Sequence, residues 1–426
     1  MSSITKGYKK TEVGVIPEEW GVKKIGEILR LCQYGSAAKS ELNGTTPVLR
    51  MGNLDNGLID WDDLVYTSNY REIQNYSLCK DDILFNRTNS PDLVGKTAIY
   101  HAEKSAIFAG YLIRLQVNTE VSAEFLNRIM NSAYFKSFCK NVKTDGVSQS
   151  NINANNLKSA WIPLPPLPEQ KAIAEVLSDM DALIEVQKEL IAKKRDIKQG
   201  AMQDLLSGRV RLPGYETKDW KHTDIGDIPN DWAVKELGAF STFLNGIGFP
   251  IMYQGKKNGD LPFCKVSDMN LVGNEVYITR ANNYISYKDA RTLHSSIIPR
   301  NSIIFAKVGA ALLLNRRRIV KNEICIDNNM MSLTPNQSVD LYYIYQNLMA
   351  IDFADYAQEG ALPSINSSQI SKIPILFPPL LEQQAIAQVL SDMDDELETL
   401  EAELEKLYHM KRGMMQELLT GRIRLI

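Results

Sequence analysis

Two long stretches of the chain carry apolar residues at alternating steps of three and four positions, with charged residues between them. The second stretch, from Ile386 to Leu418, keeps this spacing almost throughout, and the first, from Ile173 to Leu205, keeps it less strictly. Such spacing gathers the apolar side chains on one stripe of an α-helix, as in a coiled coil. We therefore expect two long helices that pack on each other. The residues expected in this packing are Ile173, Leu177, Met180, Ile184, Ile386, Leu390, Met393 and Leu397.

Proline and glycine mark where each long helix begins and ends. Proline-rich segments at 162–168 and 373–379 cannot lie inside a helix, so each helix is expected to begin just after them. Gly208 and Gly421 fit the corresponding ends. About 37 residues of helix span roughly 55 Å, so two antiparallel helices would hold the domains at their ends apart.

The sequence contains an internal repeat with an offset of just over 200 residues. Residues 8–26 and 220–238 lie 212 positions apart and are identical at nine of 19 positions. Residues 167–181 and 380–394 lie 213 positions apart and are identical at twelve of 15. A period this long means that each copy is a domain plus a connecting element, which predicts a molecule with pseudo-twofold symmetry.

Two inserts between the repeated segments have diverged. Residues from about 30 to 150 and from about 245 to 360 share only scattered positions. Both contain short β-rich runs followed by helical patterns, which predicts mixed α and β structure. The strands are expected at 82–86 and 302–306, and the helices at 123–139 and 341–356.

The expected fold class is therefore α+β. It consists of two globular α/β domains separated by two long antiparallel coiled-coil helices, with a pseudo-twofold internal repeat. The expected boundaries are 1–165 for the first domain, 166–208 for the first helix, 209–378 for the second domain and 379–426 for the second helix.

Composition and charge narrow the functional classes. The net charge of −3 is not that of a generic phosphate binder, so any surface that binds DNA must be a local basic patch. The five cysteines are scattered without metal-ligand spacing, which favours reduced thiols. The start of the chain is polar, and the longest apolar run, at 310–314, is too short to cross a bilayer. We expect no membrane contact and a cytoplasmic location.

The arrangement of the repeats resembles the specificity-subunit family of type I restriction-modification enzymes over residues 8–426. Ile-Pro-x-x-Trp precedes each insert, at 16–20 and 228–232, and the segment ending in Ala-Ile-Ala-x-Val-Leu-Ser-Asp-Met-Asp follows it. Residues 86–100 also resemble a stretch found in one group of the family's target recognition domains. The second insert departs from that stretch and has Lys307-Val-Gly-Ala there.

The resemblance implies that each insert is a target recognition domain that reads one half of a split, asymmetric DNA site. The helices would set the spacer and dock two modification subunits, which are adenine methyltransferases, and restriction subunits with motor and nuclease activity would complete the enzyme. S-adenosylmethionine, ATP and Mg²⁺ would then bind to the partner subunits, and no cofactor to this chain. Two unlike readers suit a non-palindromic site, just as two identical readers suit a palindrome.

Basic and amide side chains of the inserts are the candidates for contact with double-stranded DNA. Arg and Lys bind phosphates or guanine, Asn and Gln pair with adenine edges, and loops after strands usually carry such contacts. In the first insert these are Arg50, Asn53, Arg87, Thr88, Asn89, Ser90, Lys96, Lys143, Ser148 and Gln149. In the second insert they are Lys265, Asp268, Lys307, Arg316, Arg317, Arg318, Gln358 and Ser364.

Some of these candidates have equally ordinary explanations. The polar segment at 143–150 has the composition of a plain surface turn. The run Arg316–Arg318 suits either a grip on phosphates or a solvated strand edge. Lys265 and Lys307 hold the places of Arg50 and Arg87, so a basic residue persists while its neighbours change.

Several other residues are expected to be structural. Trp20 and Trp232 occupy the same place in the repeat, which favours core packing over stacking on bases. The four histidines lie far apart, so metal binding and general-base roles are not expected. Asp-x-Asp pairs such as Asp179 with Asp181 point to different faces of a helix, which favours capping, solvation or partner contact over acid–base chemistry.

Two alternative functions fit the sequence less well. An enzyme with fused methyltransferase or nuclease activity would need Asn/Asp-Pro-Pro-Tyr/Phe, or Pro-Asp followed by an acidic-x-Lys triplet, and the sequence has neither. A coiled-coil scaffold that binds only protein would leave two large inserts unexplained. The sequence therefore favours a non-catalytic reader of DNA.

Overall fold

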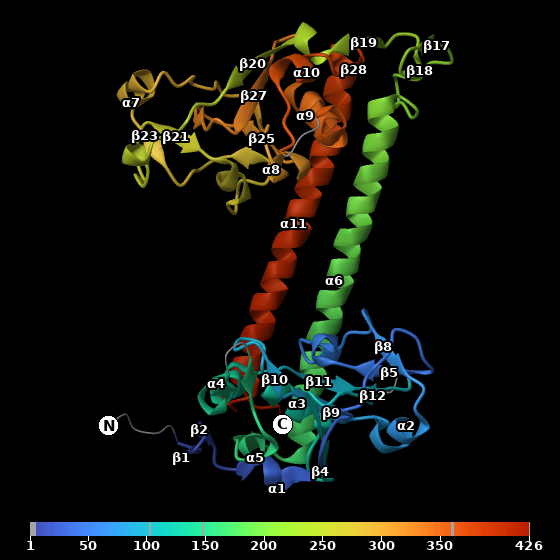
Figure 1. Ribbon diagram of the computed structural model, residues 1–426, viewed down its shortest axis with the longest axis vertical. Helices are drawn as coiled ribbons and strands as arrows, with labels where there is room; N and C mark the ends of the chain where they lie inside the picture. The colour runs from blue at the N-terminus through green and yellow to red at the C-terminus, as the bar shows by residue number, and fades with distance from the viewer. Residues whose placement is uncertain (1–5, 102–103, 147–148, 359–361, 426) are drawn as a thin grey trace. The chain divides into compact units, whose positions relative to one another are not determined.

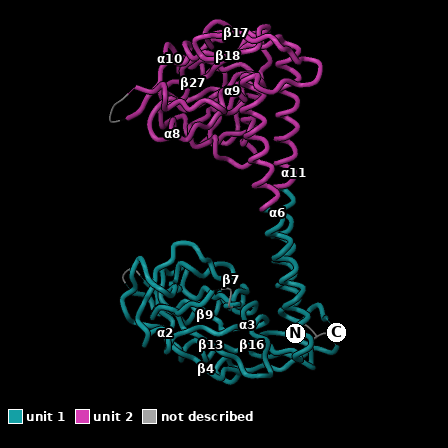
Figure 2. Tube along the Cα trace, turned by 90° about the vertical axis from the view of Figure 1, so that its right-hand side faces the viewer, with its two compact units in different colours: residues 1–188, 402–426 teal, residues 189–401 magenta. Residues whose placement is uncertain are grey.

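The computed structural model describes residues 6–101, 104–146, 149–358 and 362–425. They fall into two compact units, coloured separately in Figure 2. Unit 1 comprises residues 1–188 and 402–426, and unit 2 comprises residues 189–401. Each unit thus combines one insert with parts of both long helices.

The two predicted long helices are present as α6, Leu167–Ser207, and α11, Leu380–Leu418 (Figure 1). Within unit 1, Lys411 of α11 forms an ion pair with Asp181 of α6, and Gln187 Nε2 donates to Glu403 Oε2 at 3.4 Å. Within unit 2, Lys194 Nζ lies 2.6 Å from Glu396 Oε1, and Lys198 forms an ion pair with Asp394. Residue numbers rise on one helix as they fall on the other, so the helices run antiparallel in both units.

The residues predicted to pack the helices lie in or beside the cores. Ile173 and Leu177 are buried with Leu418 in the core of unit 1. Ile386 and Leu390 are buried with Leu205 in the core of unit 2. Met180 and Ile184 are also buried, whereas Met393 and Leu397 are only partly covered.

The insert of unit 1 is built on an antiparallel four-stranded sheet. Its strand order is β11 (Thr97–Tyr100), β9 (Asp82–Asn86), β13 (Leu112–Val117) and β4 (Leu29–Tyr34). The helices α3, Ala123–Met130, and α4, Ala133–Val142, pack their apolar faces against it. A smaller sheet joins β12 (Ile107–Phe108), β5 (Thr46–Leu49) and β8 (Val65–Thr67).

The insert of unit 2 repeats this plan with a five-stranded sheet. Its order is β20 (Ser241–Asn245), β27 (Met330–Pro335), β24 (Ile303–Ala306), β25 (Arg317–Val320) and β22 (Tyr277–Ile278). The helix α9, Leu341–Ala350, packs in the core formed with this sheet. A smaller sheet joins β23 (Tyr284–Ile285), β21 (Leu261–Cys264) and β26 (Cys325–Ile326).

Two predicted helices are shorter than expected because a polar cap interrupts each of them. The expected helix over 123–139 is divided into α3 and α4, since Ser132 accepts a hydrogen bond from the Phe135 amide and starts a new helix. The expected helix over 341–356 ends at Ala350. Asp352 then caps a short 3₁₀ turn at Phe353–Tyr356.

Each unit is closed by the same buried cluster of tryptophan, glutamate and arginine. In Trp–Glu–Arg cluster 1, the Glu169 carboxylate accepts from Trp20 Nε1 at 3.0 Å and from Arg424 Nη2 at 2.9 Å. In Trp–Glu–Arg cluster 2, the Glu382 carboxylate accepts from Trp232 Nε1 at 2.9 Å and from Arg211 Nη2 at 2.8 Å. The structural role predicted for the tryptophans is confirmed, because both are almost wholly buried.

The glycines at the helix ends allow these clusters to form. Gly208 and Gly421 have φ values of +71° and +70°, which favour glycine. A Cβ at Gly421 would lie 2.5 Å from a ring atom of Pro17, and one at Gly208 would lie 2.9 Å from Pro229. Arg211, just after α6, therefore completes the cluster of unit 2. Arg424, just after α11, completes the cluster of unit 1.

Candidate nucleic-acid interface

In unit 1, a short three-stranded sheet lies beside Arg87. Its strands are β10 (Thr88–Asn89), β15 (Ser150–Asn151) and β14 (Thr144–Asp145). The Arg87 amide donates to the Tyr111 carbonyl at 3.0 Å, and its carbonyl accepts from the Ile152 amide at 2.8 Å. These two backbone bonds fix where the Arg87 side chain starts.

The Arg87 guanidinium is then held by its neighbours. It lies over the ring of Tyr34, 4.9 Å from the centroid, and its Nη2 donates to Asn151 Oδ1 at 3.4 Å. Tyr34 and Tyr111 are both exposed, at 44% and 51%. We call Tyr34, Arg87, Tyr111 and Asn151 corner 1. It combines a positive charge, an amide and two accessible rings, which are groups that bind phosphates and base edges.

The residues around corner 1 divide by burial. Thr88 is buried, and its Oγ1 accepts from Asn151 Nδ2 at 2.8 Å, so it supports the corner from within. Asn89 and Ser90 are partly exposed and Gln149 is exposed. Lys143 lies 3.0 Å from Asp145, and the hydrogen bond from Ser150 lowers the pKa of that aspartate. Ser148 lies outside the described residues.

The other candidates of the first insert have partners of their own. Asn53 is buried, where its Oδ1 accepts from the Arg50 amide at 2.9 Å and its Nδ2 donates to the Asp62 carbonyl at 2.8 Å. We therefore correct its predicted role from DNA contact to loop support. Arg50 forms an ion pair of 3.2 Å with Asp63, and Lys96 one of 3.6 Å with Asp55. Arg50 and Lys96 keep part of their surface exposed.

Unit 2 builds the same backbone arrangement around Lys307. The Lys307 amide donates to the Asn329 carbonyl at 2.8 Å, and its carbonyl accepts from the Ile365 amide at 3.0 Å. Single β-bridges join Val308 and Gln358 to Ser364, in place of the three short strands of unit 1. Lys307 thus occupies the backbone position of Arg87.

The side chains at this position differ from those of unit 1. Lys307 Nζ donates to Asn245 Oδ1 at 2.7 Å, where unit 1 has the stack on Tyr34. We call Asn245, Lys307, Asn329 and Ser364 corner 2. Asn245 and Asn329 are exposed, and Ser364 is partly exposed. The two corners have the same pattern of backbone hydrogen bonds but different hydrogen-bonding side chains.

Burial changes the charge balance near corner 2. It lowers the pKa of Lys307, and the nearby Asp327 carboxylate opposes that shift. Burial also raises the pKa of Asp327 itself, although the Asn329 amide donates to it at 2.9 Å. Both groups therefore favour their neutral forms more than exposed groups would.

Three further candidates of the second insert are structural, which corrects their predicted contact with DNA. Asp268 is buried and accepts from the Lys265 amide at 2.8 Å and from Asn282 Nδ2 at 2.7 Å. Arg317 is 0% exposed, donates to the Ile351 carbonyl at 2.8 Å and lies 4.0 Å from the Phe353 ring centroid. Arg318 donates to the Met269 carbonyl at 3.0 Å.

The alternation of strand β25 explains the correction for Arg317. Arg317 and Ile319 point into the core, so a basic run in the sequence is divided between opposite faces of the sheet. Arg316 remains partly exposed and donates to Asn270. Lys265 is also partly exposed, with its Nζ donating to Gln254 Oε1 at 2.7 Å.

Sequence analysis missed five residues of the two corners: Tyr34, Tyr111, Asn151, Asn245 and Asn329. The sequence contains a signal for two of them. Tyr34 ends strand β4 and Asn245 ends strand β20, and a glycine follows each of them. A Cβ at Gly35 would lie 2.2 Å from the Ala109 carbonyl oxygen, and one at Gly246 would lie 1.8 Å from that of Asp327. The repeated glycine marks where two backbones approach closely.

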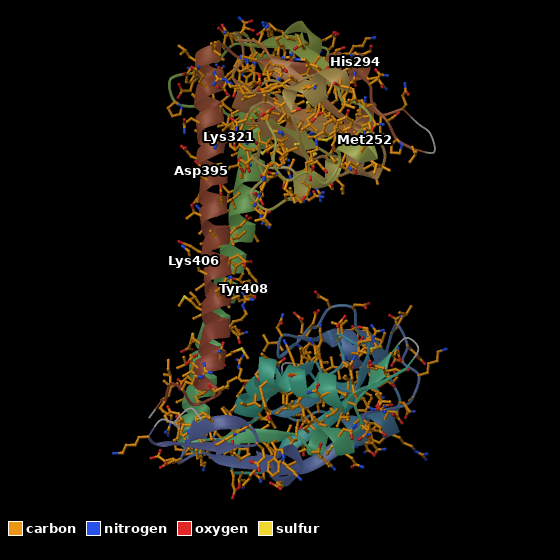
Figure 3. All side chains as sticks on the ribbon, turned by 90° about the vertical axis from the view of Figure 1, so that its left-hand side faces the viewer. Met252, His294, Lys321, Asp395, Lys406 and Tyr408 are labelled. Carbon is orange, nitrogen blue, oxygen red and sulfur yellow. The ribbon has the colours of Figure 1, made fainter. Side chains whose placement is uncertain are left out.

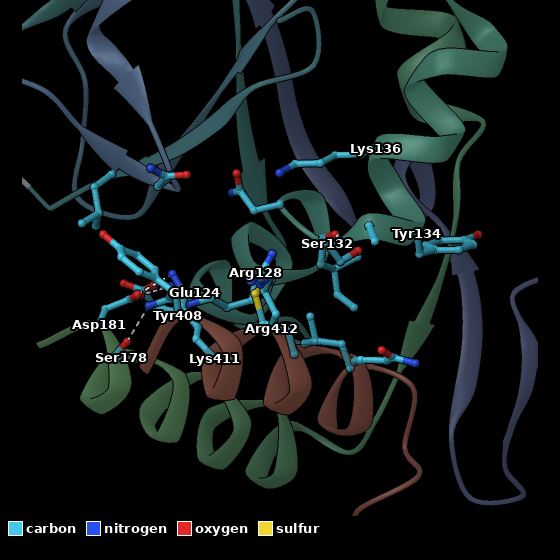
Figure 4. A pocket seen from close by; sticks show the side chains of 18 of the residues that line it. Glu124, Arg128, Ser132, Tyr134, Lys136, Ser178, Asp181, Tyr408, Lys411 and Arg412 are labelled. Carbon is cyan, nitrogen blue, oxygen red and sulfur yellow. Dashed lines mark hydrogen bonds and ion pairs between the residues drawn. The ribbon is translucent and has the colours of Figure 1, made fainter. Parts of the chain in front are cut away.

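Unit 1 also has a wide groove of about 2260 Å³, lined by charged and aromatic side chains (Figure 4). Arg128 of α3 binds Asp181 of α6 and donates to Ser178 Oγ at 2.9 Å, and Lys411 of α11 binds the same aspartate. In unit 2 the corresponding Asp394 accepts from Gln346 Nε2 at 2.9 Å and from Tyr342 Oη at 2.6 Å. These aspartates fix the insert to the helices.

In the part of the chain that the structure describes, no cluster of three or more His, Cys, Asp or Glu side chains could hold a metal ion. Over the same residues, every helix is too short or too polar to cross a membrane.

A family model described as the type I restriction modification DNA specificity domain matches residues 17–193 and 229–408. This chain belongs to that family. Its role is DNA specificity, and it is a recognition subunit of a type I restriction-modification system, not an enzyme. The family predicted from the repeats is confirmed, as is the fold of two α/β inserts and two long helices in a pseudo-twofold repeat.

Similar proteins match this specificity subunit over nearly its whole length. The candidate type I restriction enzyme MjaX specificity subunit of Methanocaldococcus jannaschii is 32% identical over 98% of this chain and 97% of its own. The EcoKI specificity subunit of Escherichia coli is 21% identical over 96% and 90%. The type I S subunit from M. genitalium shares the fold, with a TM-score of 0.55 and 16% identity over 94% of this chain and 96% of that chain.

Proposed function

We propose that this specificity subunit reads two unlike half-sites of a split DNA sequence, one with each unit. The observation that carries the proposal is the pair of corners, which share their backbone hydrogen bonds while their side chains differ. Different side chains on the same backbone arrangement suit a DNA target whose two halves differ. The candidate contacts are Arg87 with Asn89 in unit 1, and Lys307 with Asn245 in unit 2.

The proposal extends to the partners. Two modification subunits would dock on the helices α6 and α11, and restriction subunits would complete the complex. A cytoplasmic site of action follows from these partners. S-adenosylmethionine, ATP and Mg²⁺ would bind to the partners, and this chain would supply none of the catalytic groups. The sequence supports this assignment because it lacks the Asn/Asp-Pro-Pro-Tyr/Phe motif of adenine methyltransferases.

The test is selection from randomised duplexes by the full chain co-expressed with its modification subunit. Sequencing of the bound pool is expected to give two short, unlike motifs at one fixed spacing. A pool without enrichment, taken from a complex that is intact and binds DNA, would contradict the proposal. It would favour a scaffold that binds only protein.

A further inference from the structure

The loop after strand β20 exposes two large apolar side chains on the surface of unit 2. Ile251 is 87% exposed and Met252 is 80% exposed, and Figure 3 labels Met252 at this surface. Apolar side chains this exposed have a solvation cost, and they are favourable where a partner covers them. We define the apolar tip as Ile251 and Met252.

Hydrogen bonds and ring stacking anchor the residues that flank the apolar tip. Two backbone bonds close its 3₁₀ turn, from the Tyr253 amide to the Pro250 carbonyl at 3.1 Å and from Gln254 to Ile251 at 3.0 Å. Phe249, just before the turn, stacks on the buried Phe263 with ring centroids 3.7 Å apart. Since its neighbours are anchored, the tip stays at the surface.

The same loop is continuous with corner 2. It begins at Asn245, whose side chain accepts a hydrogen bond from Lys307. Ile247 then forms a β-bridge with Asp327. On its far side, Gln254 accepts from Lys265, and that ammonium group lies 5.5 Å from the Phe249 ring centroid. The apolar tip therefore lies in a loop connected at both ends to basic side chains.

Exposed lysines beside the apolar tip favour nucleic acid as the partner. Lys256 and Lys257 follow within five residues of Met252, and both are exposed. Lys256 Nζ lies 3.6 Å from Asp289 Oδ2, and Lys257 Nζ donates to the Asn282 carbonyl at 3.4 Å. Lysines bind phosphates, while an apolar side chain contacts the C5-methyl group of thymine or the face of a base step. An apolar protein surface would cover the tip but would not pair with these two lysines.

Building on the proposed function, we infer that the apolar tip makes direct contact with a thymine methyl group in the half-site read by unit 2. The loop of unit 1 at the matching place, residues 35–44, is four residues shorter than the loop at 246–259. It exposes one large apolar side chain, Leu42, at 82%, so the adjacent pair of apolar side chains is a feature of unit 2. The matching ends are the close-approach glycines at 35 and 44, and at 246 and 259.

The experiment compares the wild-type chain with an Ile251→Ser, Met252→Ser double variant, each in complex with the modification subunit. The probe is the selected duplex, with each thymine of the unit 2 half-site replaced in turn by uracil. The wild-type complex should lose about fourfold in affinity at one thymine, the effect of one buried methyl group. The variant should lose affinity for the intact site and show no response to that replacement.

A matched control is Val272→Ser, because Val272 is 79% exposed in another loop of the same unit. It should retain the wild-type affinity and the response to uracil. A variant complex with unchanged affinity and unchanged response would overturn the inference, and so would a uracil scan without effect. Failure of the proposed function would differ, because the wild-type pool would then contain no half-site at all.

Discussion

Arginine side chains of the two inserts have opposite roles, and burial separates them. Arg87 is partly exposed beside an exposed tyrosine, whereas Arg317 is wholly buried. The sequence predicted both as contacts, because residue type and loop position do not show on which face of a strand a side chain lies. Only the register of β25 against β24 decides it.

The first prediction concerns the two basic residues of the corners. Arg87→Ala should weaken binding about tenfold or more and relax specificity in the first half-site only, since one base or phosphate contact is lost. Lys307→Ala should do the same for the second half-site. Binding to duplexes with single substitutions measures this, with Lys10→Ala, on the exposed hairpin strand, as the control. Loss that is equal across all sequences would contradict a role in specificity.

The second prediction is that Arg317 acts on stability. Arg317→Met should lower the free energy of unfolding of unit 2 by about 2 to 4 kcal/mol, because buried carbonyl groups lose their donors. Arg316→Ala should change it by less than about 1 kcal/mol, since Arg316 is accessible to solvent. Denaturant unfolding measures both. A stable Arg317→Met protein with weakened DNA binding would restore Arg317 as a contact.

The third prediction is a dependence on pH at Asp327. Its folded-state pKa is raised, so its favourable contribution is present below its unfolded pKa of about 4 and is lost as the pH rises through the folded-state value. Near neutral pH the buried carboxylate therefore destabilises unit 2. Asp327→Asn should raise the unfolding midpoint at pH 7, and the difference should shrink toward pH 4. A midpoint that is lowered at pH 7 would contradict this assignment.

At the scale of elements, the ends of the long helices close the units. The glycines that end the two long helices were visible in the sequence, and so were the helices, because apolar spacing, proline and glycine are local signals. The sequence did not show that the segment after α6 completes unit 2 and that the segment after α11 completes unit 1. That pairing joins residues 171 and 255 positions apart, which no local pattern encodes.

The fourth prediction tests this closure. Arg424→Ala should destabilise unit 1 by about 3 to 5 kcal/mol, because the Glu169 carboxylate stays buried and loses its ionic partner. Arg211→Ala should have the same effect on unit 2, so each variant is the matched control for the other. Limited proteolysis that locates the opened unit distinguishes them. Opening of the same unit by both variants would contradict the closure seen here.

At the scale of the whole molecule, duplication and divergence have separate consequences. Both units repeat the buried Trp–Glu–Arg cluster, the aspartate on the long helix and the backbone around the corner. The two units differ mainly in the side chains of the corners, where unit 1 has Tyr34 and unit 2 has Asn245. Sequence comparison of the two halves therefore identified the frame, but the presented side chains required the sheet register.

The measurement that tests the central claim most directly is a replacement of one insert by the other. Residues 241–365, which carry corner 2, would be replaced by residues 29–152, which carry corner 1, and the complex with the modification subunit would be selected against randomised duplexes. Circular dichroism and complex formation confirm that the chain is folded. We predict a site made of two copies of the first half-site. An unchanged site, or a second motif unrelated to the first, would contradict the account that each insert reads its own half.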